Sequence, residues 1–187
     1  MPFTKEDRRA RRTRERLRQA LAQLLFEKEL AHITVREVTE LADVNRSTFY
    51  LHYTDLHDLY QKTEDGVVQE ITAIIEAYPR KPGAPSLMSV VSSVFDYVAQ
   101  NVRLCTALLR TNDTAFIMRI VDANRPQTEE QWKALMGDCT LPRDYFYSFL
   151  TAGCVGLLRT WFDNGLREPP IQIAALAERL MAAARNL

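Results

Sequence analysis

The stretch Ile33-Thr-Val-Arg-Glu-Val-Thr-Glu-Leu-Ala-Asp-Val-Asn-Arg-Ser-Thr-Phe-Tyr-Leu-His-Tyr53 predicts two short helices joined by a three-residue turn. Thr34 can cap the first helix with its hydroxyl, and Glu37, three residues later, completes a capping box. Asp43 falls where the chain must turn sharply, and Asp tolerates the left-handed backbone conformation better than most residues other than Gly. Asn45 is a favourable N-cap for the second helix. We interpret this stretch as a helix-turn-helix whose second helix is exposed.

The second helix carries a set of hydrogen-bonding side chains, and Phe49 is the one residue clearly expected in the interior. In a helix-turn-helix the start of this helix enters the major groove, and neighbouring groups hold phosphates. We therefore expect Arg46, Ser47 and Thr48 to lie at or beside base edges, and Tyr50 and His52 to contact phosphates. The alternative is an ordinary helical hairpin with a solvated polar face. The predicted DNA-binding residues are Thr34, Arg36, Asn45, Arg46, Ser47, Thr48, Tyr50, His52 and Tyr53.

The segments Thr34-Val-Arg-Glu-Val38 and Ser47-Thr-Phe-Tyr-Leu-His-Tyr53 resemble the DNA-binding domain of the TetR family of transcriptional regulators. The resemblance covers about residues 10 to 62 and includes the family's Tyr-x-His-aromatic signature. Two positions depart from the usual pattern. Asp43 replaces a common turn Gly, and Leu56 stands where the family often has a Lys that contacts phosphate. The second departure removes one expected DNA contact and leaves the expected fold unchanged.

Charge is unevenly distributed although the chain as a whole has a formal net charge of zero. Residues 1 to 18 contain eight basic and three acidic side chains, a net charge of +5, so the remainder totals −5. The distribution of charge along the chain indicates a nucleic-acid partner better than the total charge does. We expect the basic start to lie along the DNA backbone or to reach a minor groove; the alternative is a solvated, frayed helix start.

Composition predicts an all-α globular protein. Hydrophobic residues make up 47% and charged residues 26% of the 187 residues, glycines are few, and no useful strand-like alternation occurs. No apolar run has the length of a signal peptide or a transmembrane helix, so we expect a cytoplasmic protein. Cys105, Cys139 and Cys154 are odd in number and widely spaced, which indicates neither disulfides nor a zinc site. We expect no metal and no cofactor, and the cysteines to be small core side chains.

The helical pattern suggests about nine helices in two domains. Leu17, Ala20, Leu21, Leu24 and Leu25 form one apolar stripe, and a fourth helix should run from about Asp55 to Tyr78. The proline-rich stretch 79–86 breaks the chain, and Pro126 should interrupt or restart a helix between 112 and 136. Helices should follow over about 142–164, ended by Gly165, and from Pro169-Pro170 onward. We expect residues 1–62 to form the helix-turn-helix DNA-binding domain and residues 63–187 a helical effector-binding and dimerisation domain.

The last two helices look similar to the C-terminal domains of TetR relatives that regulate dihydroxyacetone kinase, on the spacing of Gly153, Gly156, Leu157, Trp161 and Gly165. The family resemblance implies that these helices form a four-helix dimer bundle. A helical Gly costs about 1 kcal/mol relative to Ala, so close approach of another backbone is a reason for Gly153 and Gly156; close packing within one subunit is the alternative. The predicted dimer residues are Phe146, Leu150, Gly153, Leu157, Trp161, Ile173, Leu176 and Leu180.

The resemblance also implies a pocket for a small-molecule effector in the second domain. The aromatic side chains there are mostly expected in the core, and no ligand class follows from them. The candidate pocket residues are Phe95, Phe116, Trp132, Tyr145 and Phe149.

These patterns bear on three possible functions. The leading hypothesis is a homodimeric repressor that binds a near-palindromic operator in double-stranded DNA and is released by a small-molecule effector. The alternative is a DNA-bound activator or corepressor whose C-terminal domain responds to a protein partner. An enzyme is not expected, because all three histidines lie in the DNA-binding part and no nucleophile or carboxylate is paired with a base in a known motif.

Overall fold

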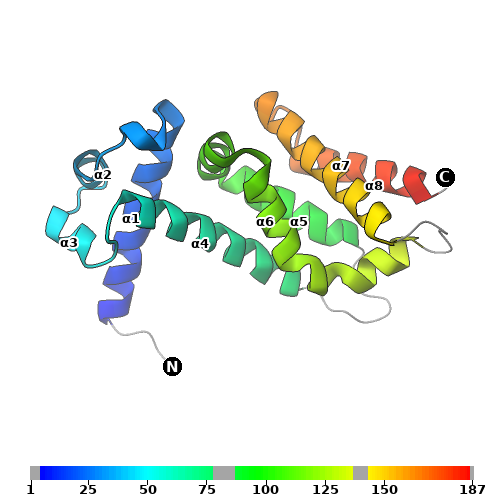
Figure 1. The fold of residues 1–187 in the computed structure, drawn as a ribbon, viewed down its shortest axis with the longest axis horizontal. Helices are drawn as coiled ribbons and strands as arrows, with labels where there is room; N and C mark the ends of the chain where they lie inside the picture. Colours follow the sequence, from blue (N-terminus) through cyan, green and yellow to red (C-terminus); the bar gives the residue numbers. More distant parts are fainter. Residues whose placement is uncertain (1–4, 78–86, 137–142, 186–187) are drawn as a thin grey trace. The chain divides into compact units, whose positions relative to one another are not determined.

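The computed structural model describes residues 5–77, 87–136 and 143–185, and all regular secondary structure in these ranges is helical (Figure 1). The all-α fold class is therefore confirmed. The predicted break at 79–86 lies outside the described residues. The elements in chain order are α1 (Lys5–Glu27), the 3-10 helix η1 (Leu30–His32), α2 (Val35–Leu41), α3 (Arg46–Tyr50), α4 (Leu56–Glu76), α5 (Leu87–Gln100), α6 (Val102–Met136), α7 (Arg143–Asp163) and α8 (Pro170–Arg185).

The chain divides into two compact units. Unit 1 comprises Met1–Val67 together with Arg103–Asp113, and unit 2 comprises Val68–Val102 together with Thr114–Leu187. Helices α4 and α6 each contribute residues to both units. The compact units therefore differ from the predicted domains in that unit 1 extends five residues further along α4 and includes the start of α6.

Unit 1 is built on the predicted apolar stripe of α1. Leu17, Leu21 and Leu25 are buried there, and α2 packs on α1 and on α3. Burying a leucine side chain stabilises a fold by about 1.5–3 kcal/mol, so this stripe holds the short helices that could not persist alone. The other buried apolar side chains of unit 1 include Ile33, Val38, Ala42, Phe49, Tyr53, Leu59, Tyr60, Val67, Leu104, Ala107 and Leu108.

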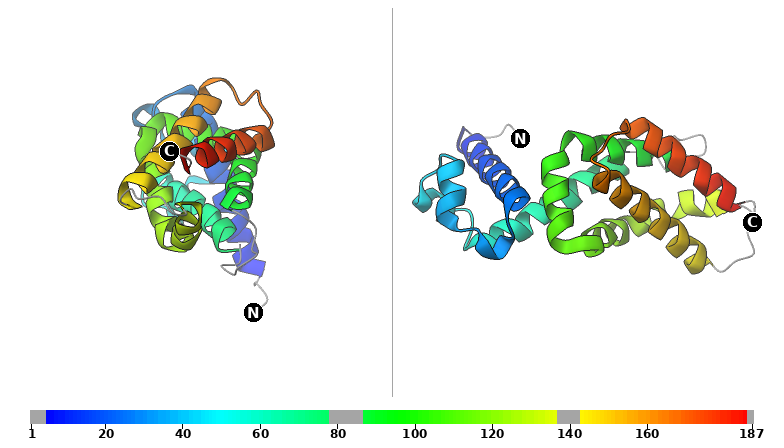
Figure 2. Two further views of the ribbon diagram at one scale, coloured as in Figure 1. Left: turned by 90° about the vertical axis from the view of Figure 1, so that its right-hand side faces the viewer. Right: turned by 90° about the horizontal axis from the view of Figure 1, so that it is seen from above.

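Unit 2 contains α8 packed against both α5 and α7. Figures 1 and 2 show α7 and α8 side by side. Phe95 of α5 and Trp161 of α7 meet in its core with ring centroids 5.5 Å apart. The indole Nε1 of Trp161 donates to the carbonyl of Glu168 at 3.0 Å, which gives the buried ring its polar partner.

The end of α7 follows the sequence prediction. Gly165 has φ +74, its N–H donates to the carbonyl of Phe162, and the N–H of Leu166 donates to the carbonyl of Trp161. This is a Schellman motif, in which a left-handed residue lets two amides cap the last carbonyls of a helix. Pro170 then begins α8, where its missing N–H costs nothing.

The prediction that Pro126 interrupts or restarts a helix is wrong. α6 runs unbroken from Val102 to Met136 with Pro126 inside it. A proline removes one hydrogen bond and crowds the carbonyl four residues earlier, which bends a helix without ending it when the turns on both sides keep their own bonds. Figure 1 shows that the unit 2 part of α6 changes direction along its length.

The described residues provide neither a membrane span nor a metal site. None of their helices is both long and apolar enough to cross a bilayer, and they gather no group of three or more His, Cys, Asp or Glu side chains that could hold a metal ion. Cys105 is buried, and burial raises the pKa of the half-buried Cys154 thiol to about 11. Cys154 is therefore a neutral thiol at neutral pH.

Candidate nucleic-acid interface

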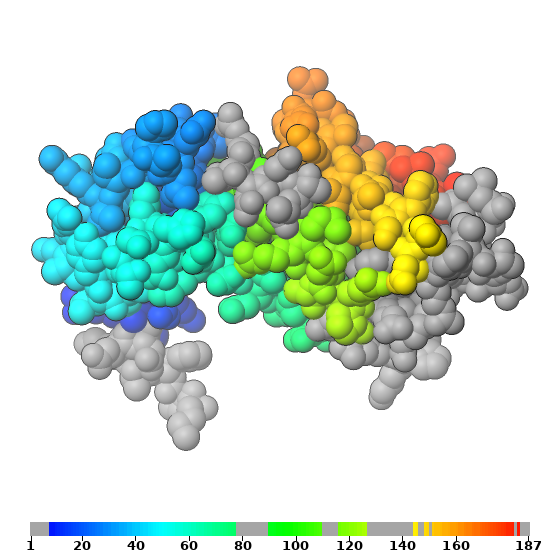
Figure 3. Space-filling model, viewed as in Figure 1, coloured from blue at the N-terminus to red at the C-terminus, as the bar shows by residue number. Residues whose placement is uncertain are grey.

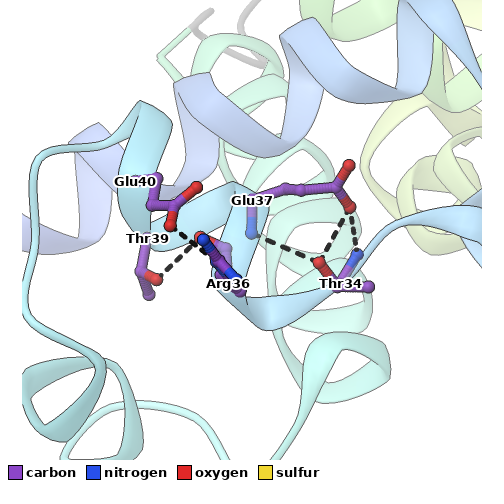
Figure 4. Close-up of polar contacts among 5 residues, drawn as sticks. All are labelled: Thr34, Arg36, Glu37, Thr39 and Glu40. Carbon is purple, nitrogen blue, oxygen red and sulfur yellow. Dashed lines mark hydrogen bonds and ion pairs between the residues drawn. The ribbon is translucent and has the colours of Figure 1, made fainter.

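The first helix of the helix-turn-helix is closed by the predicted capping box. Figure 4 shows the N–H and hydroxyl of Thr34 donating to one carboxylate oxygen of Glu37, at 2.9 and 2.8 Å, while the N–H of Glu37 donates to the Thr34 hydroxyl at 3.3 Å. Lys28 adds an ion pair to the same carboxylate. The hydrogen bond from Lys28 has the largest effect on the pKa of Glu37, and together with the hydrogen bonds from Thr34 it lowers that pKa to about 2. The start of α2 is thereby fixed to the end of α1.

The turn between α2 and α3 contains the expected left-handed residue. Asp43 has φ +48, a region that residues with a Cβ seldom occupy outside Asn and Asp. Its carboxylate pairs with the Arg16 guanidinium at 2.8 Å, which ties the turn to α1. The pair is solvent-exposed, so we expect it to contribute at most about 1 kcal/mol.

Helix α3 is capped and anchored as the sequence predicts. The Asn45 side-chain oxygen accepts from the N–H of Ser47 at 2.9 Å and from its hydroxyl at 2.8 Å. Phe49 is completely buried, and its ring lies 5.6 Å from that of Tyr53, which is also in the core. These two residues, four apart, fix which side of the helix faces inward.

The other residues of α3 and the two that follow it lie at different angles around the helix axis. Ser47 and its neighbour four residues on, Leu51, lie opposite the buried side, and both are exposed. Arg46 and Tyr50 lie on one flank of this outer face, and Thr48 and His52 lie on the other flank. In Figure 3 the cyan residues around α3 form part of the surface of unit 1.

Arg46 and Tyr50 are already in contact on their flank. A guanidinium nitrogen of Arg46 donates to the Tyr50 hydroxyl at 3.2 Å, and the guanidinium carbon lies 5.6 Å from the centroid of that ring. Such contacts restrict the rotamers of a long side chain before it meets a ligand. Arg46 therefore presents its donors from a partly ordered position.

His52 and Tyr53 follow α3, and His52 lies near the positive charges of Arg14 and Lys62. Burial, then the positive charges of Arg14 and Lys62, lowers the pKa of His52, whereas burial raises that of Tyr53. The Lys62 ammonium donates to the carbonyl of His52 at 3.3 Å and to Asp58 at 2.9 Å. Sequence patterns missed the proximity of Arg14 and Lys62 to α3, because only the packing of α1 and α4 produces it.

Several predicted DNA-binding side chains also have structural contacts. The Thr34 hydroxyl and Asn45 amide serve as caps, the Tyr53 ring is buried, and Arg36 pairs with Glu40 at 2.7 Å while most of its side chain is exposed (Figure 4). Arg46, Ser47 and Tyr50 are the exposed members of the set on α3 itself. The sequence-based set omitted Leu51, since a leucine is ordinarily assigned to the core.

Positive charge in unit 1 is concentrated on α1. Arg8, Arg9, Arg11, Arg12 and Arg14 are all exposed on this helix, and one acidic residue, Glu15, lies between Arg8 and Arg18. A cluster of arginines on one helix supplies the sequence-independent attraction that phosphates require. The exposed arginines of α1 and the residue types on α3 together suit double-stranded DNA.

The outer surface of unit 2 includes a second candidate site on α7 and α8. On α7 the exposed side is lined by Tyr145, Phe149, Ala152 and Gly156, each three or four residues from the next. Apart from the adjacent backbone of α7 itself, no atom lies within 4 Å of the place where a Cβ would stand on Gly153 or Gly156, so neither glycine serves close packing among the described residues. Leu176 and Leu180 are exposed on α8 beside it.

The predicted dimer residues divide between the two sides of these helices. Gly153, Leu176 and Leu180 are exposed and Leu157 is half-buried, whereas Trp161 and Ile173 are buried within the chain. The side chains of Phe146 and Leu150 lie outside the described residues. The exposed stripe of α7 is thus shifted by about one residue from the predicted one.

The candidate effector residues are similarly divided. Phe95 and Phe116 are buried in unit 2, but Tyr145 and Phe149 are 73% and 66% exposed on the outer side of α7. The Trp132 side chain lies outside the described residues. Phe95 and Phe116 therefore stay candidates for an interior effector pocket. Tyr145 and Phe149 instead lie on the exposed part of α7 that also contains Gly153 and Gly156.

Comparison with known proteins matches this chain to a family model and to a curated relative. Residues 86–183 match a TetR-type family model described as "Transcriptional regulator C-terminal region". The chain is also 43% identical over 56 residues to the HTH-type transcriptional regulator YxbF of Bacillus subtilis. That match covers 29% of this chain and 15% of the length of YxbF.

Solved structures share the fold across nearly the whole chain. The dihydroxyacetone kinase operon activator DhaS has a TM-score of 0.68 at 12% identity, covering 93% of this chain and 96% of that one. FadR from Bacillus subtilis in complex with stearoyl-CoA has a TM-score of 0.70 at 14% identity, covering 90% and 97%. SmeT, the repressor of the Stenotrophomonas maltophilia efflux pump SmeDEF, has a TM-score of 0.70 at 16% identity, covering 91% and 89%. At these identities the likeness is one of fold.

Proposed function

This chain belongs to the TetR family of transcriptional regulators, and we propose that it is a homodimeric repressor that a small-molecule effector releases from a near-palindromic operator. We further propose that residues 1–62 act as its DNA-binding domain and residues 63–187 as its effector-binding and dimerisation domain. The observation that carries the proposal is on α3, where Arg46, Ser47 and Tyr50 are exposed while Phe49 is fully buried.

DNA recognition is divided among these side chains by their chemistry. Arg46 can make a bidentate contact with guanine, and the Ser47 hydroxyl, which donates to Asn45, can accept a hydrogen bond at a base edge. We assign Tyr50 and His52, on the two flanks of the outer face, to phosphates. Arginines of α1 supply further sequence-independent attraction.

Dimerisation follows from the requirements of a short recognition helix. α3 has five residues, and one such helix contacts too few base pairs to select an operator. Two copies related by a two-fold axis would read half-sites about 34–36 Å apart. The exposed apolar and glycine-containing side of α7 and α8 is the surface we assign to the partner copy.

An effector is proposed to bind within unit 2 around Phe95 and Phe116. FadR, which shares the fold, was solved with stearoyl-CoA, so a fold of this kind can enclose a small molecule. To switch the protein almost completely between DNA-bound and released states, an effector must bind one state more tightly by about 5.5 kcal/mol. A weaker preference would give partial release.

The alternative is a DNA-bound activator or corepressor whose C-terminal domain responds to a protein partner. DhaS, described as an operon activator, shares the fold to a similar degree as the repressor SmeT. The exposed apolar side of α7 and α8 could also be used by a different protein. A protein that remains monomeric in solution would favour this alternative.

The test begins with selection of bound sequences from a random duplex pool, together with the mass of the complex. A palindromic site bound by two chains is expected. Arg46→Ala should change the preferred sequence at a cost of about 1–3 kcal/mol, whereas Tyr50→Ala and His52→Ala should weaken binding to all duplexes alike. The Tyr50 hydroxyl is uncharged, so its loss should leave the salt slope unchanged, whereas loss of His52 should lower the slope by about one phosphate where its ring is protonated. Arg167→Ala, at an exposed position between α7 and α8, is the control. An unchanged preferred sequence for Arg46→Ala would contradict this division of roles.

A further inference from the structure

Leu51 is the most exposed large apolar side chain among the described residues. It is 80% exposed, more than any other large apolar side chain there. It is the C-cap of α3, with φ −73 and ψ −21, so it continues the helical backbone. A single exposed leucine is ordinary on a protein surface, but the position of Leu51 is unusual.

That position is the middle of the proposed DNA-reading face. Leu51 follows Ser47 by four residues, so both side chains lie on one side of the helix. This side is opposite Phe49 and Tyr53, which are buried. Leu51 therefore faces the same surface as Ser47, between the flanks that carry Tyr50 and His52.

The chemistry of the major groove limits what a leucine can recognise there. A leucine neither donates nor accepts a hydrogen bond, so it gains nothing from a phosphate or a polar base edge. The base edges display one apolar group, the C5-methyl of thymine. Removing a methyl-sized apolar surface from water is worth about 0.8 kcal/mol, or roughly fourfold in affinity.

We propose that Leu51 selects a thymine in each half-site by packing against its 5-methyl group. This rests on the proposed DNA-binding function of α3 and adds a base preference that the polar residues of the helix do not supply. It accounts for a large apolar side chain exposed on an otherwise polar face, because the methyl group covers it when DNA binds.

The experiment replaces thymine by deoxyuridine, which removes the methyl group and keeps every hydrogen bond. After the preferred duplex has been selected, each thymine of a half-site is replaced in turn and the dissociation constant is measured. For the unaltered protein we expect a roughly fourfold loss at one thymine per half-site. For Leu51→Ala we expect no change at that thymine.

Two variants control for other causes. Leu51→Met keeps an apolar side chain and should retain the thymine preference, and Leu41→Ala removes the 44% exposed leucine at the end of α2 and should leave it intact. The salt slope of Leu51→Ala should equal that of the unaltered protein, because leucine neutralises no phosphate. Thermal unfolding of each variant checks that the exposed position does not affect folding.

The outcomes separate this proposal from the function on which it rests. Failure of the unaltered protein to select any duplex would overturn both. Selective binding that is indifferent to deoxyuridine at every thymine, or a Leu51→Ala variant that discriminates as the unaltered protein does, would overturn the role of Leu51 alone. If the Leu51→Ala variant discriminates as the unaltered protein does, leucine is present at this position only because it suits a helix.

Discussion

Individual side chains on α3 have roles set by their angle to Phe49. Phe49 is fully buried, so its orientation determines which neighbours can reach a ligand. Arg46 is held beside Tyr50, and His52 sits at the opposite flank near Arg14 and Lys62. The same helix thus presents an arginine restrained by a hydrogen bond on one flank and a neutral imidazole in positive surroundings on the other.

The state of His52 gives a prediction about pH. Burial and neighbouring cations hold its pKa below the ordinary 6.5, so in the free protein the folded state favours the neutral ring and loses stability relative to the unfolded chain as pH falls below about 6.5. A phosphate favours the charged ring. DNA binding should therefore take up a proton, and affinity should rise as pH is lowered from 7.5 to 6, by at most about tenfold per pH unit for one proton.

Titration of DNA affinity at constant salt measures this linkage. His52→Gln should bind more weakly at pH 6 and show a flatter pH dependence. If the variant retains the full pH dependence, another group is responsible and the assignment of His52 to a phosphate is wrong.

At the scale of elements, two short helices depend on the turn and cap that position them. α2 has seven residues and α3 has five, too few to be stable alone. The capping box, the Asp43 turn and the packing of α2 on α1 supply what intrinsic helix propensity does not. Changes at the turn and the cap should therefore alter the stability of unit 1.

Replacement of Asp43 tests the turn. Asp43→Gly should change the free energy of unfolding by less than about 1 kcal/mol, because relief of the left-handed conformation offsets the lost pair with Arg16. Asp43→Val should destabilise by more, about 1–3 kcal/mol, because a β-branched residue is strained at positive φ. Urea unfolding measures both, and equal stability of the two variants would show that the turn relaxes to another conformation.

Acid unfolding tests the cap. The Glu37 pKa of about 2 lies below the ordinary 4.5, so the carboxylate stabilises the fold fully above about pH 4.5, and this contribution is lost as pH falls toward 2. Glu37→Gln should be less stable at neutral pH and lose less stability between those values. Circular dichroism against urea at several pH values measures this. A variant with the same acid sensitivity as the unaltered protein would contradict the importance of this carboxylate.

At the scale of the whole molecule, the exposed side of α7 and α8 is the surface that we assign to a second copy of the chain. Tyr145 and Phe149 are more than half exposed, and Gly156 lies on the same side with open space around it. Glycine inside a helix is destabilising relative to alanine, and close approach of another backbone is one reason for its presence. A second copy of the chain would supply such an approach and cover the aromatic side chains.

Gly156→Ala distinguishes a dimer seam from a free surface. On a free surface, alanine should stabilise the chain by about 1 kcal/mol through helix propensity alone. At a close seam it should instead weaken the dimer and, with it, binding to a palindromic duplex. Sedimentation at several protein concentrations measures dissociation of the dimer. Gln69→Ala, at an exposed position of α4, is the control. Greater stability with an unchanged dimer would place the seam elsewhere.

Local patterns in the sequence were sufficient for the elements whose signals are short-range. The Thr34 to Glu37 box, the left-handed Asp43, the Asn45 cap and the ending of α7 at Gly165 all depend on residues within a few positions of one another. Capping and turn chemistry act over the same distance, so the sequence determined them directly. The Tyr-x-His-aromatic signature in the helix-turn-helix is equally local and predicted the TetR resemblance, and the match of residues 86–183 to the family model confirms it.

Tertiary structure decided what local patterns left open. Helix α7 is apolar on more than one side, so its periodicity did not separate the inward side, with Trp161, from the outward side, with Phe149. Pro126 was expected to interrupt α6, yet the helix continues through it. The exposure of Leu51, and the placement of Arg14 and Lys62 near His52, arise from the packing of helices distant in sequence. A residue's type limits what it can contact, but only the assembled helices determine what lies within its reach.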